Sequence, residues 1–372
     1  MTIVFRTDSS LEIGTGHVMR CLTLACALRG SGAECRFVTR ALPGHLADRM
    51  RENGFDVTLL PPPQGTAPQG PTTHANWAGV DWTLDAAETR AALESDRPDW
   101  LIVDHYAFDA YWEKAVLTEG TKLMVIDDLA DRPHECILLL DQNLGRTASD
   151  YDGLVPESCQ RLIGPRYALL RPEFAAVRAE ALAARAGRSL KHLLISMGGI
   201  DGADATSAVL TALRDAALPD DLRITVIMGR NAPALERVRV LAHNMSRPTE
   251  VSVDVSDLAT RMTAADLGIG AAGTTTWERC SVGLPSIIVQ TAENQAGIAQ
   301  IMEEAGAGLD PGPLRAPNFA QSLQSVLAEA SDPARLVELS ENAARICDGD
   351  GSRRVAAVLL TTDKCHKFKA MV

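Results

Sequence analysis

The chain has 372 residues, of which 46% are hydrophobic and 23% are charged, and these values are typical of a globular protein with two domains of ordinary size. Its formal net charge of −12 at pH 7 argues against a nucleic-acid partner, because proteins that bind nucleic acids usually present a basic face. The charge does not exclude an anionic small ligand, since backbone N–H groups at helix starts bind phosphate without basic side chains.

The sequence also predicts a cytoplasmic protein. The stretch from Met1 to Asp8 has no basic region followed by an apolar one, so no secretory signal is expected. No apolar run approaches the roughly 20 residues of a membrane span, so no membrane partner is expected. The eight cysteines form no Cys-x-x-Cys pair, which favours reduced thiols over a zinc site or a disulfide framework. The oligomeric state is left open, and a monomer is compatible with the sequence.

In the first half of the chain, apolar strands alternate with helices. Strands are expected at 3–5, 34–39, 56–60, 100–104, 122–126 and 136–140, and helices at 17–29, 45–53, 82–95 and 108–119. The strands are continuous apolar runs, as in a parallel sheet that is covered on both faces. Residues 61–73 are rich in proline and glycine and predict a surface loop.

A second α/β series begins near residue 190. Its expected strands are 192–196, 223–228, 251–253, 266–269 and 286–289, and its expected helices are 204–216, 232–243, 257–264, 274–282 and 294–305. The alternation predicts an α/β fold of two Rossmann-like, doubly wound domains. We expect an N-terminal domain at 1–165, a C-terminal domain at 166–350, and a helix and tail at 351–372 that could pack back on the first domain.

The polar loop between the first strand and the first helix is the first candidate site, because ligands of open parallel sheets bind at the carboxyl ends of strands. Asp8 begins this loop, Gly14 and Gly16 allow a tight turn, and His17 stands near the helix N-terminus. Such a position suits an anion and disfavours imidazolium, so His17 is expected to be neutral and able to accept a proton. The alternative is a polar residue at a helix start with no chemical role.

Two turns in the second half are candidates for phosphate binding. Gly198 and Gly199 follow the first strand there and permit close approach of a phosphate, although an ordinary tight turn has the same residues.

The stronger candidate is a run of small residues that ends at Gly273 and leads into a helix opened by Thr274, Thr275 and Thr276. Free N–H groups and hydroxyls at this helix start could bind a diphosphate. Glu278, one turn later, could accept hydrogen bonds from ribose hydroxyls. The alternative is a threonine cap followed by a first-turn glutamate.

Polar residues follow other predicted strands as well. Such side chains suit sugar hydroxyls, and a carboxylate there could also orient a histidine, although each could equally be a polar residue in a turn. The candidates for the sugar side are Asp104, His105, Tyr106, Asn143, Asn294 and Gln295. Asp127 and Asp128 also end a strand, but no ligand set of suitable spacing accompanies them, so neither a metal nor another cofactor is expected.

Seven motifs are spread along the chain. They are Arg6-x-Asp8-x(5)-Gly14-x-Gly16-His17-Val18-Met19-Arg20-Cys21-Leu22, Val103-Asp104-His105-Tyr106, Ile126-Asp127-Asp128-Leu129, Gly164-Pro165-x-Tyr167-Ala168-Leu169-Leu170-Arg171-Pro172-x-Phe174, Gly198-Gly199-Ile200-Asp201, Ala272-Gly273-Thr274-Thr275-Thr276-Trp277-Glu278 and Asn294-Gln295. Together these motifs resemble the UDP-2,4-diacetamido-2,4,6-trideoxy-β-L-altropyranose hydrolases of pseudaminic acid biosynthesis, and several are shared with spore coat polysaccharide proteins. The resemblance extends from residue 3 to about 358; the combination is specific, whereas each motif alone is not. The loop 61–73 and the tail after 362 depart from the family pattern.

The resemblance implies the GT-B glycosyltransferase fold, in which two domains face a cleft that takes the UDP-sugar. It implies attack of water at the anomeric carbon, C–O cleavage with inversion and departure of UDP, without a metal. It also implies that His17 is the catalytic base, that Glu278 holds the ribose, and that the first domain binds the sugar and the second binds UDP. Two alternatives stay open: a GT-B glycosyltransferase that uses a UDP-sugar donor, and a non-catalytic UDP-sugar-binding protein.

Overall fold

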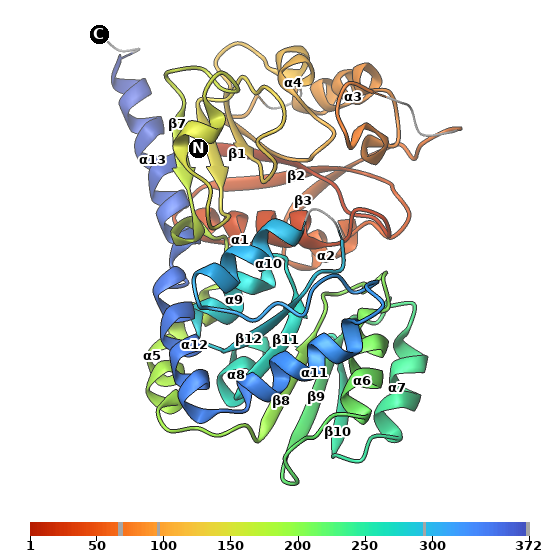
Figure 1. Cartoon of the computed structure of the whole chain (residues 1–372). Coiled ribbons are helices and arrows are strands. Elements are labelled where there is room, and N and C mark those ends of the chain that lie inside the picture. Colours follow the sequence, from red (N-terminus) through yellow and green to blue (C-terminus); the bar gives the residue numbers. More distant parts are fainter. Residues whose placement is uncertain (66–69, 95–96, 293–294, 370–372) are drawn as a thin grey trace. The chain divides into compact units, whose positions relative to one another are not determined.

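Figure 1 shows the chain as a computed structural model, which describes residues 1–65, 70–94, 97–292 and 295–369, with the side chains of the last helix described up to residue 362. The chain divides into two compact units. Unit 1 contains Met1–Leu169 and Gly351–Val372, and unit 2 contains Leu170–Asp350. No helix within the described residues is both long and apolar enough to cross a membrane.

Unit 1 is built on a seven-stranded sheet in which all neighbouring strands are parallel, in the order β3-β2-β1-β4-β5-β6-β7. The strands are β1 (Thr2–Thr7), β2 (Glu34–Arg40), β3 (Asp56–Leu60), β4 (Trp100–Asp104), β5 (Lys122–Ile126), β6 (Leu138–Asp141) and β7 (Gln160–Ile163).

Helices cover both faces of this sheet. Ile3 and Phe5 of β1 pack with α1 (Gly16–Gly30), α2 (Ala47–Glu52) and α13 (Gly351–Lys369) on one face. Val4 packs with α3 (Trp82–Glu94) and α4 (Ala110–Val116) on the other. Because successive strand residues point to opposite faces and both faces are covered, the central strands β1, β4, β5 and β6 are largely apolar, as expected. Three short 3₁₀ helices join these elements: η1 (Ala75–Ala78), η2 (Ala148–Tyr151) and η3 (Pro165–Tyr167).

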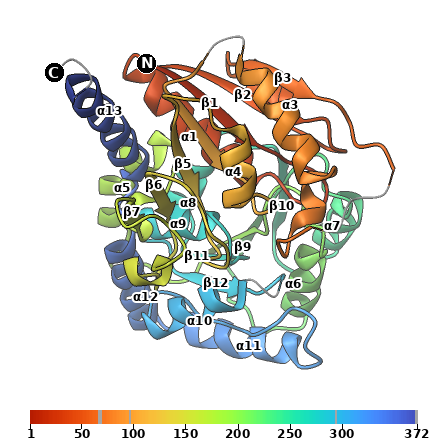
Figure 2. The ribbon, with the colours of Figure 1, turned by 90° about the horizontal axis from the view of Figure 1, so that it is seen from above.

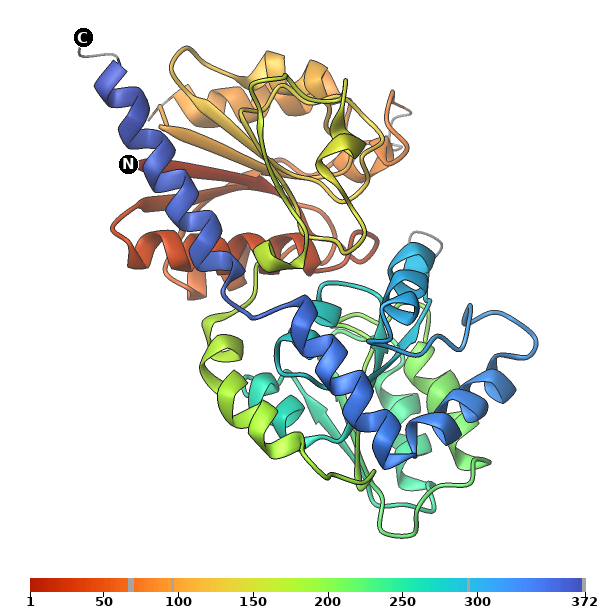
Figure 3. The ribbon, with the colours of Figure 1, turned by 60° about the vertical axis from the view of Figure 1, so that its left-hand side comes forward.

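The last helix belongs to unit 1 although it follows unit 2 in sequence. Figure 3 shows α13, in blue, lying against unit 1, where it contacts α1. Val355, Ala356 and Leu359 are buried in the same cluster as the apolar face of α1.

Unit 2 has a five-stranded parallel sheet in the order β10-β9-β8-β11-β12. Its main core cluster packs the sheet against α6, α7, α11 and α12, while α5 contacts α8 and α9 (Figure 2). The strands are β8 (His192–Ser196), β9 (Arg223–Met228), β10 (Thr249–Val253), β11 (Leu267–Ala271) and β12 (Ser286–Val289), and the helices are α5 (Pro172–Arg185), α6 (Ala205–Arg214), α7 (Leu235–His243), α8 (Leu258–Ala264), α9 (Thr275–Ser281), α10 (Ala296–Glu304), α11 (Phe319–Ala330) and α12 (Pro333–Ile346).

Four elements were not predicted from sequence: β7, α5, α11 and α12. β7 is a four-residue strand at the edge of its sheet with two polar residues, so it lacks an apolar run. α5 lies in the stretch expected to join the domains. Only Phe174, Ala181 and Arg185 are buried in it, so its apolar stripe is too thin for a clear helical periodicity.

The start of α13 predicts a packing constraint that stability measurements can test. A Cβ on Gly351 would overlap the backbone of Tyr167 and Ala168 in η3 and just after it. We expect Gly351→Ala to lower the free energy of unfolding by about 1–3 kcal/mol, as overpacking typically does. Gly30→Ala is the matched control, because a Cβ there meets no atom within 4 Å. Equal urea midpoints for the two variants would contradict this tight packing.

Candidate active site

Both units place their candidate residues where the strand order of a sheet reverses. β1 lies between β2 and β4 in unit 1, and β8 lies between β9 and β11 in unit 2. Ligands of doubly wound sheets bind outside the carboxyl ends of the strands at this switch point. His17 and Asp104 stand just after β1 and at the end of β4, and residues 198–201 and 272–278 follow β8 and β11.

His17 and Asp104 form a close pair. Nδ1 of His17 lies 2.6 Å from Oδ1 of Asp104, whose carboxylate is fully buried. An ionised carboxylate only accepts hydrogen bonds, so Nδ1 carries a hydrogen, and in the neutral imidazole the lone pair is on Nε2. Within the described part of the chain, no hydrogen bond to Nε2 of His17 is present. The pair therefore has the geometry of a general base held by a carboxylate.

Arg20 keeps Asp104 ionised. Its Nε and Nη2 atoms bind the two carboxylate oxygens of Asp104 at 2.6 and 2.7 Å. Burial alone would raise the pKa of Asp104, but the charge of Arg20 and the bond to His17 hold this pKa well below its usual range. The sequence analysis assigned Arg20 no role. Its position three residues after His17, which puts both side chains on one helical face, was the available signal.

Asp128 extends this network toward two predicted site residues. It accepts hydrogen bonds from Arg20 Nη1 and the Tyr106 hydroxyl, both at 2.6 Å, and from Asn143 Nδ2 at 3.1 Å. Burial and the neighbouring Asp128 charge raise the pKa of Tyr106 well above its usual value, so its hydroxyl remains the donor. Asp104 and Tyr106, from the end of β4, and Asn143, after β6, are thus linked to Arg20 directly or through Asp128.

Aromatic rings stand beside His17. The ring of Tyr106 meets His17 edge-on with centroids 4.6 Å apart, and Trp77 stacks on Tyr106 at 5.4 Å. His74 lies against Trp77 at 4.5 Å. Asn76 donates a 2.7 Å hydrogen bond to Glu12, which ties η1 to the loop before His17. The segment that follows the proline-rich loop therefore forms one wall beside the histidine.

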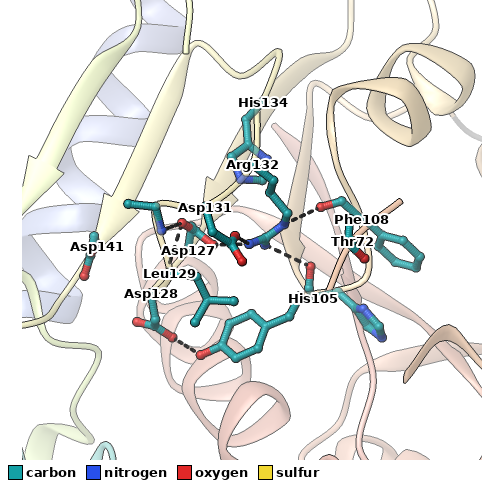
Figure 4. Close-up of polar contacts among 12 residues, drawn as sticks. Thr72, His105, Phe108, Asp127, Asp128, Leu129, Asp131, Arg132, His134 and Asp141 are labelled. Carbon is teal, nitrogen blue, oxygen red and sulfur yellow. Dashed lines mark hydrogen bonds and ion pairs between the residues drawn. The ribbon is translucent and has the colours of Figure 1, made fainter. Parts of the chain in front are cut away.

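Arg132 fixes the loop that carries Tyr106. Figure 4 shows its guanidinium between Asp127 and the backbone oxygens of His105 and Phe108. The distances are 2.8 Å to Asp127 Oδ1, 3.4 Å to His105 O and 2.8 Å to Phe108 O. Arg132 thus anchors the residues on either side of Tyr106 to the end of β5.

Asp8 and His105, predicted on the sugar side, lie in a different environment. Asp8 is fully buried and pairs with Arg6 at 2.6 Å, and its Oδ2 lies 3.2 Å from His105 Nε2. Burial alone would raise the pKa of Asp8, but Arg6 holds it well below its usual range. Both side chains therefore point into a buried ionic cluster between β1 and α3, because a strand-end position does not determine which way a side chain points.

The two predicted glycines of the first loop leave open space. Gly14 has a φ of 81°, which favours glycine, and Cβ atoms at Gly14 and Gly16 would meet nothing within 4 Å. The backbone before His17 is thus accessible.

In unit 2, the loop at 198–201 combines an open turn with a helix cap. Gly198 has a φ of 98° and open space at its Cβ position, and Gly199 is exposed. The Asp201 carboxylate accepts hydrogen bonds from Ala205 N and Thr206 N, both at 2.9 Å, so it caps α6. A Cβ on Gly229 would overlap Gly199 O, which shows that the two loops touch.

The small residues in β11 and in the loop after it have different surroundings. A Cβ on Gly268 or Gly270 would crowd the buried Arg279, together with Leu284 or the backbone of Ser196. Gly273, in contrast, has open space around its Cβ position. Thr274 is the N-cap residue of α9, but its side chain makes no capping hydrogen bond. The side chains of Thr275 and Thr276 accept hydrogen bonds from Arg279 at 3.4 and 3.1 Å.

Glu278 has one carboxylate oxygen without a protein partner. Oε1 lies 3.5 Å from Arg171 Nη2, while Oε2 is buried and unpaired among the described residues. Burial raises the pKa of Glu278, and Arg171 limits the rise. A buried, unpaired carboxylate oxygen can accept a hydrogen bond from a ligand hydroxyl.

The structure describes only part of the segment after β12 that contains the predicted residues Asn294 and Gln295. Asn294 lies outside the described residues. Oε1 of Gln295 accepts hydrogen bonds from the backbone N and the hydroxyl of Thr291, at 3.0 and 2.9 Å, so this oxygen supports its own turn. No group of three or more His, Cys, Asp or Glu side chains suited to a metal ion occurs within the described ranges.

Sequence comparison relates the chain to nucleotide-sugar enzymes. It is 28% identical over 251 residues to the UDP-2,4-diacetamido-2,4,6-trideoxy-β-L-altropyranose hydrolase of Campylobacter jejuni, covering 66% of this chain and 77% of that protein. It is also 28% identical over 197 residues to the spore coat polysaccharide biosynthesis protein SpsG of Bacillus subtilis, covering 53% and 57%. The resemblance to this hydrolase family is confirmed. Residues 193–339 match the glycosyltransferase family 28 C-terminal domain.

Solved structures identify the fold. The chain matches MurG of Acinetobacter baumannii with a TM-score of 0.68 at 14% identity, covering 97% of this chain and 99% of that one. It matches the glycotransferase of kitacinnamycin with a TM-score of 0.66 at 19% identity, covering 97% and 98%. The predicted GT-B fold of two Rossmann-like domains is therefore confirmed.

Asp141, at the end of β6, keeps its proton to a higher pH than an ordinary carboxyl because its pKa is raised to about 7. Tyr151 has one hydroxyl hydrogen, yet its oxygen lies 2.9 Å from both Asp127 Oδ2 and Asp141 Oδ2. Both contacts can be hydrogen bonds only if one carboxyl is protonated. Arg132 keeps the pKa of Asp127 low despite burial, whereas burial and the Asp128 charge raise the pKa of Asp141 to about 7. Asp141 thus donates to Tyr151, which donates to Asp127.

The raised pKa of Asp141 predicts that the stabilities of the wild-type protein and of an Asp141→Asn variant differ in their pH dependence. The folded pKa of Asp141 lies above its unfolded value, so its contribution is complete below about pH 4 and is lost as pH rises to about 7. Asn cannot ionise and keeps a donor toward Tyr151. We expect Asp141→Asn to gain unfolding free energy relative to wild type across this interval, by at most about 4 kcal/mol, and no more above it.

Urea unfolding at pH 4 to 8.5 measures the difference. Parallel pH dependences of the two proteins would contradict the protonated Asp141. Nε of Arg146 lies 3.4 Å from Asp141 Oδ2, and a nearby cation favours the ionised carboxylate. Arg146→Gln should therefore raise the pKa of Asp141 further and extend the pH range of the stability change to higher pH.

Proposed function

We propose that the protein is a metal-independent, inverting hydrolase of a UDP-linked 2,4-diacetamido-2,4,6-trideoxy sugar that releases UDP and the free sugar by C–O cleavage. The observation that carries this proposal is the His17–Asp104 pair, with Nε2 of His17 unpartnered. The Campylobacter relative, named as a hydrolase of such a UDP-sugar, supplies the substrate class.

His17 is the base in this proposal. Asp104 accepts the Nδ1 hydrogen of His17, which leaves Nε2 to take a proton from water as the water oxygen attacks the anomeric carbon. The imidazolium that forms is stabilised by the Asp104 carboxylate, which Arg20 keeps ionised. The sugar C–O bond breaks as the new one forms, and the electron pair leaves with UDP, so no strong general acid is needed.

Unit 2 supplies the UDP-binding residues in this proposal. Open space at Gly198 and Gly273 admits phosphate oxygens near backbone N–H groups. The hydroxyl of Thr274, which makes no capping bond, is available to the diphosphate. The unpaired Oε2 of Glu278 accepts a hydrogen bond from a ribose hydroxyl. Positioned donors aimed at developing charge usually make the largest catalytic contribution.

A second candidate is a GT-B glycosyltransferase. The match of residues 193–339 to the family 28 domain supports it, because the same donor site serves transfer to an acceptor. A glycosyltransferase would release UDP slowly until an acceptor sugar is added, whereas the hydrolase needs only water.

Replacing the base tests the proposal. We expect His17→Ala to lower kcat for UDP release by about 10²- to 10⁴-fold, the usual contribution of a general base, without loss of UDP binding. Asp104→Asn should lower kcat in the same direction, because the tautomer and orientation of His17 depend on the carboxylate. His45→Ala is the control, since Nδ1 of His45 only accepts from Ala47 N in its own turn. Near-normal turnover of His17→Ala would refute the role of His17.

A further inference from the structure

Arg279 is a buried cation directly beneath the loop that opens α9. The residue is 2% exposed. Its Nη2 donates to Ala271 O and Thr276 Oγ1, both at 3.1 Å, and its Nη1 donates to Thr275 Oγ1 at 3.4 Å. Its Nε is buried without a hydrogen-bond partner in the described part of the chain. All three bonds thus reach the segment that carries Gly273 and the threonines.

None of these partners is charged. Among the described residues, no carboxylate lies within ion-pair distance of Arg279, and the nearby Glu278 is paired with Arg171 instead. The buried Arg6 and Arg20, in contrast, each bind two carboxylates. Burial lowers the pKa of Arg279 to about 10, although the charge of Glu278 limits the fall, and Arg279 stays charged at neutral pH. A buried charge without a direct ion pair is unfavourable.

Arg185 shows how a buried arginine is compensated elsewhere in unit 2. Its three bonds, at 2.8 to 2.9 Å, go to the backbone oxygens of Met262, Ala265 and Val282, at the C-terminal ends of α8 and α9. These helix ends carry partial negative charge. Arg279 lies in the last turn of α9, but its guanidinium reaches back to Ala271 O and to the hydroxyls of Thr275 and Thr276 at the helix start. N–H groups at a helix start are partly positive, so the guanidinium charge adds to theirs.

The chain makes room for this unfavourable charge. A Cβ on Gly270 would overlap Nη1 of Arg279, and a Cβ on Gly268 would lie 3.1 Å from its Cδ. A Cβ on Gly270 would also lie 2.8 Å from Ser196 O, and one on Gly268 would lie 3.1 Å from Leu284 Cδ2, so Arg279 is one of several close neighbours of these glycines. An apolar residue at 279 would fill the space of the guanidinium without a buried charge.

We infer that Arg279 provides the counter-charge for a nucleoside diphosphate bound at Gly273–Thr276 and, through Thr275 and Thr276, positions that loop. Arg279 is thus a positioning residue. The negative charges of the ligand's phosphates compensate its positive charge, and its hydrogen bonds to the loop stay in place. The inference rests on the proposed UDP site in unit 2.

Arg279→Met tests the inference because methionine has a similar length and no charge. We expect the melting temperature of the ligand-free protein to stay the same or rise, since a buried charge is removed and Ala271 O keeps its contact with Thr276 Oγ1. The Kd for UDP, measured by calorimetry, should rise by roughly tenfold or more, as expected for loss of a unit charge about 10 Å away at an effective dielectric constant of about 20. Arg279→Lys should recover most of the affinity.

The outcomes separate a charge effect from a structural one. A variant Arg279→Met that fails to fold, or Arg279→Lys that binds as weakly as Arg279→Met, would overturn the inference, because Arg279 would then serve only the packing of the loop. Unchanged UDP affinity in Arg279→Met would also overturn it. Arg185→Met is the matched control, for which we expect lower stability and an unchanged Kd below its melting temperature. If the wild-type chain itself does not bind UDP, the proposed function fails, and with it the basis of the inference.

Discussion

Burial of the Asp104 carboxylate is the constraint on which the first unit's site depends. A carboxylate with no exposure has to be matched by positive or donating groups, and α1 supplies both His17 and Arg20 from one face. Satisfying Asp104 therefore fixes the start of α1 over the end of β4. It also fixes the histidine tautomer and leaves Nε2 unpartnered. Arg20 then links the pair to Asp128, and through it to Tyr106 and Asn143.

The two units use opposite electrostatic arrangements at equivalent places in their sheets. At the switch point of unit 1, carboxylates from the ends of β4 and β5 bind one arginine, Arg20. This arrangement suits a base that becomes positive during reaction. At the switch point of unit 2, a buried arginine that forms no ion pair among the described residues reaches a helix start, which suits an anionic ligand. These charges support the proposed division of roles between sugar chemistry in unit 1 and UDP binding in unit 2.

Much of this could be predicted from the sequence, because strand-to-helix alternation and polar strand ends are local signals. They indicated the doubly wound fold, His17, Asp104 and the turn at Gly273. The direction of a side chain is not local, however, so Asp8 proved to lie in a buried cluster with Arg6. Nor could the sequence separate glycines that accommodate Arg279 from those that leave open space. Compensation of a buried charge depends on elements that are distant in sequence.

Hydrolysis in ¹⁸O-labelled water tests the central claim most directly. The purified chain is incubated with the UDP-linked 2,4-diacetamido-2,4,6-trideoxy sugar, without an acceptor. After rapid quenching, the masses of the products are measured by mass spectrometry. UDP is the decisive product, because the anomeric oxygen of a free sugar can exchange with water. Attack at the anomeric carbon predicts unlabelled UDP and a labelled sugar. Label in UDP would show P–O cleavage, and no UDP release without an acceptor would show that the chain is not a hydrolase; either result would contradict the account.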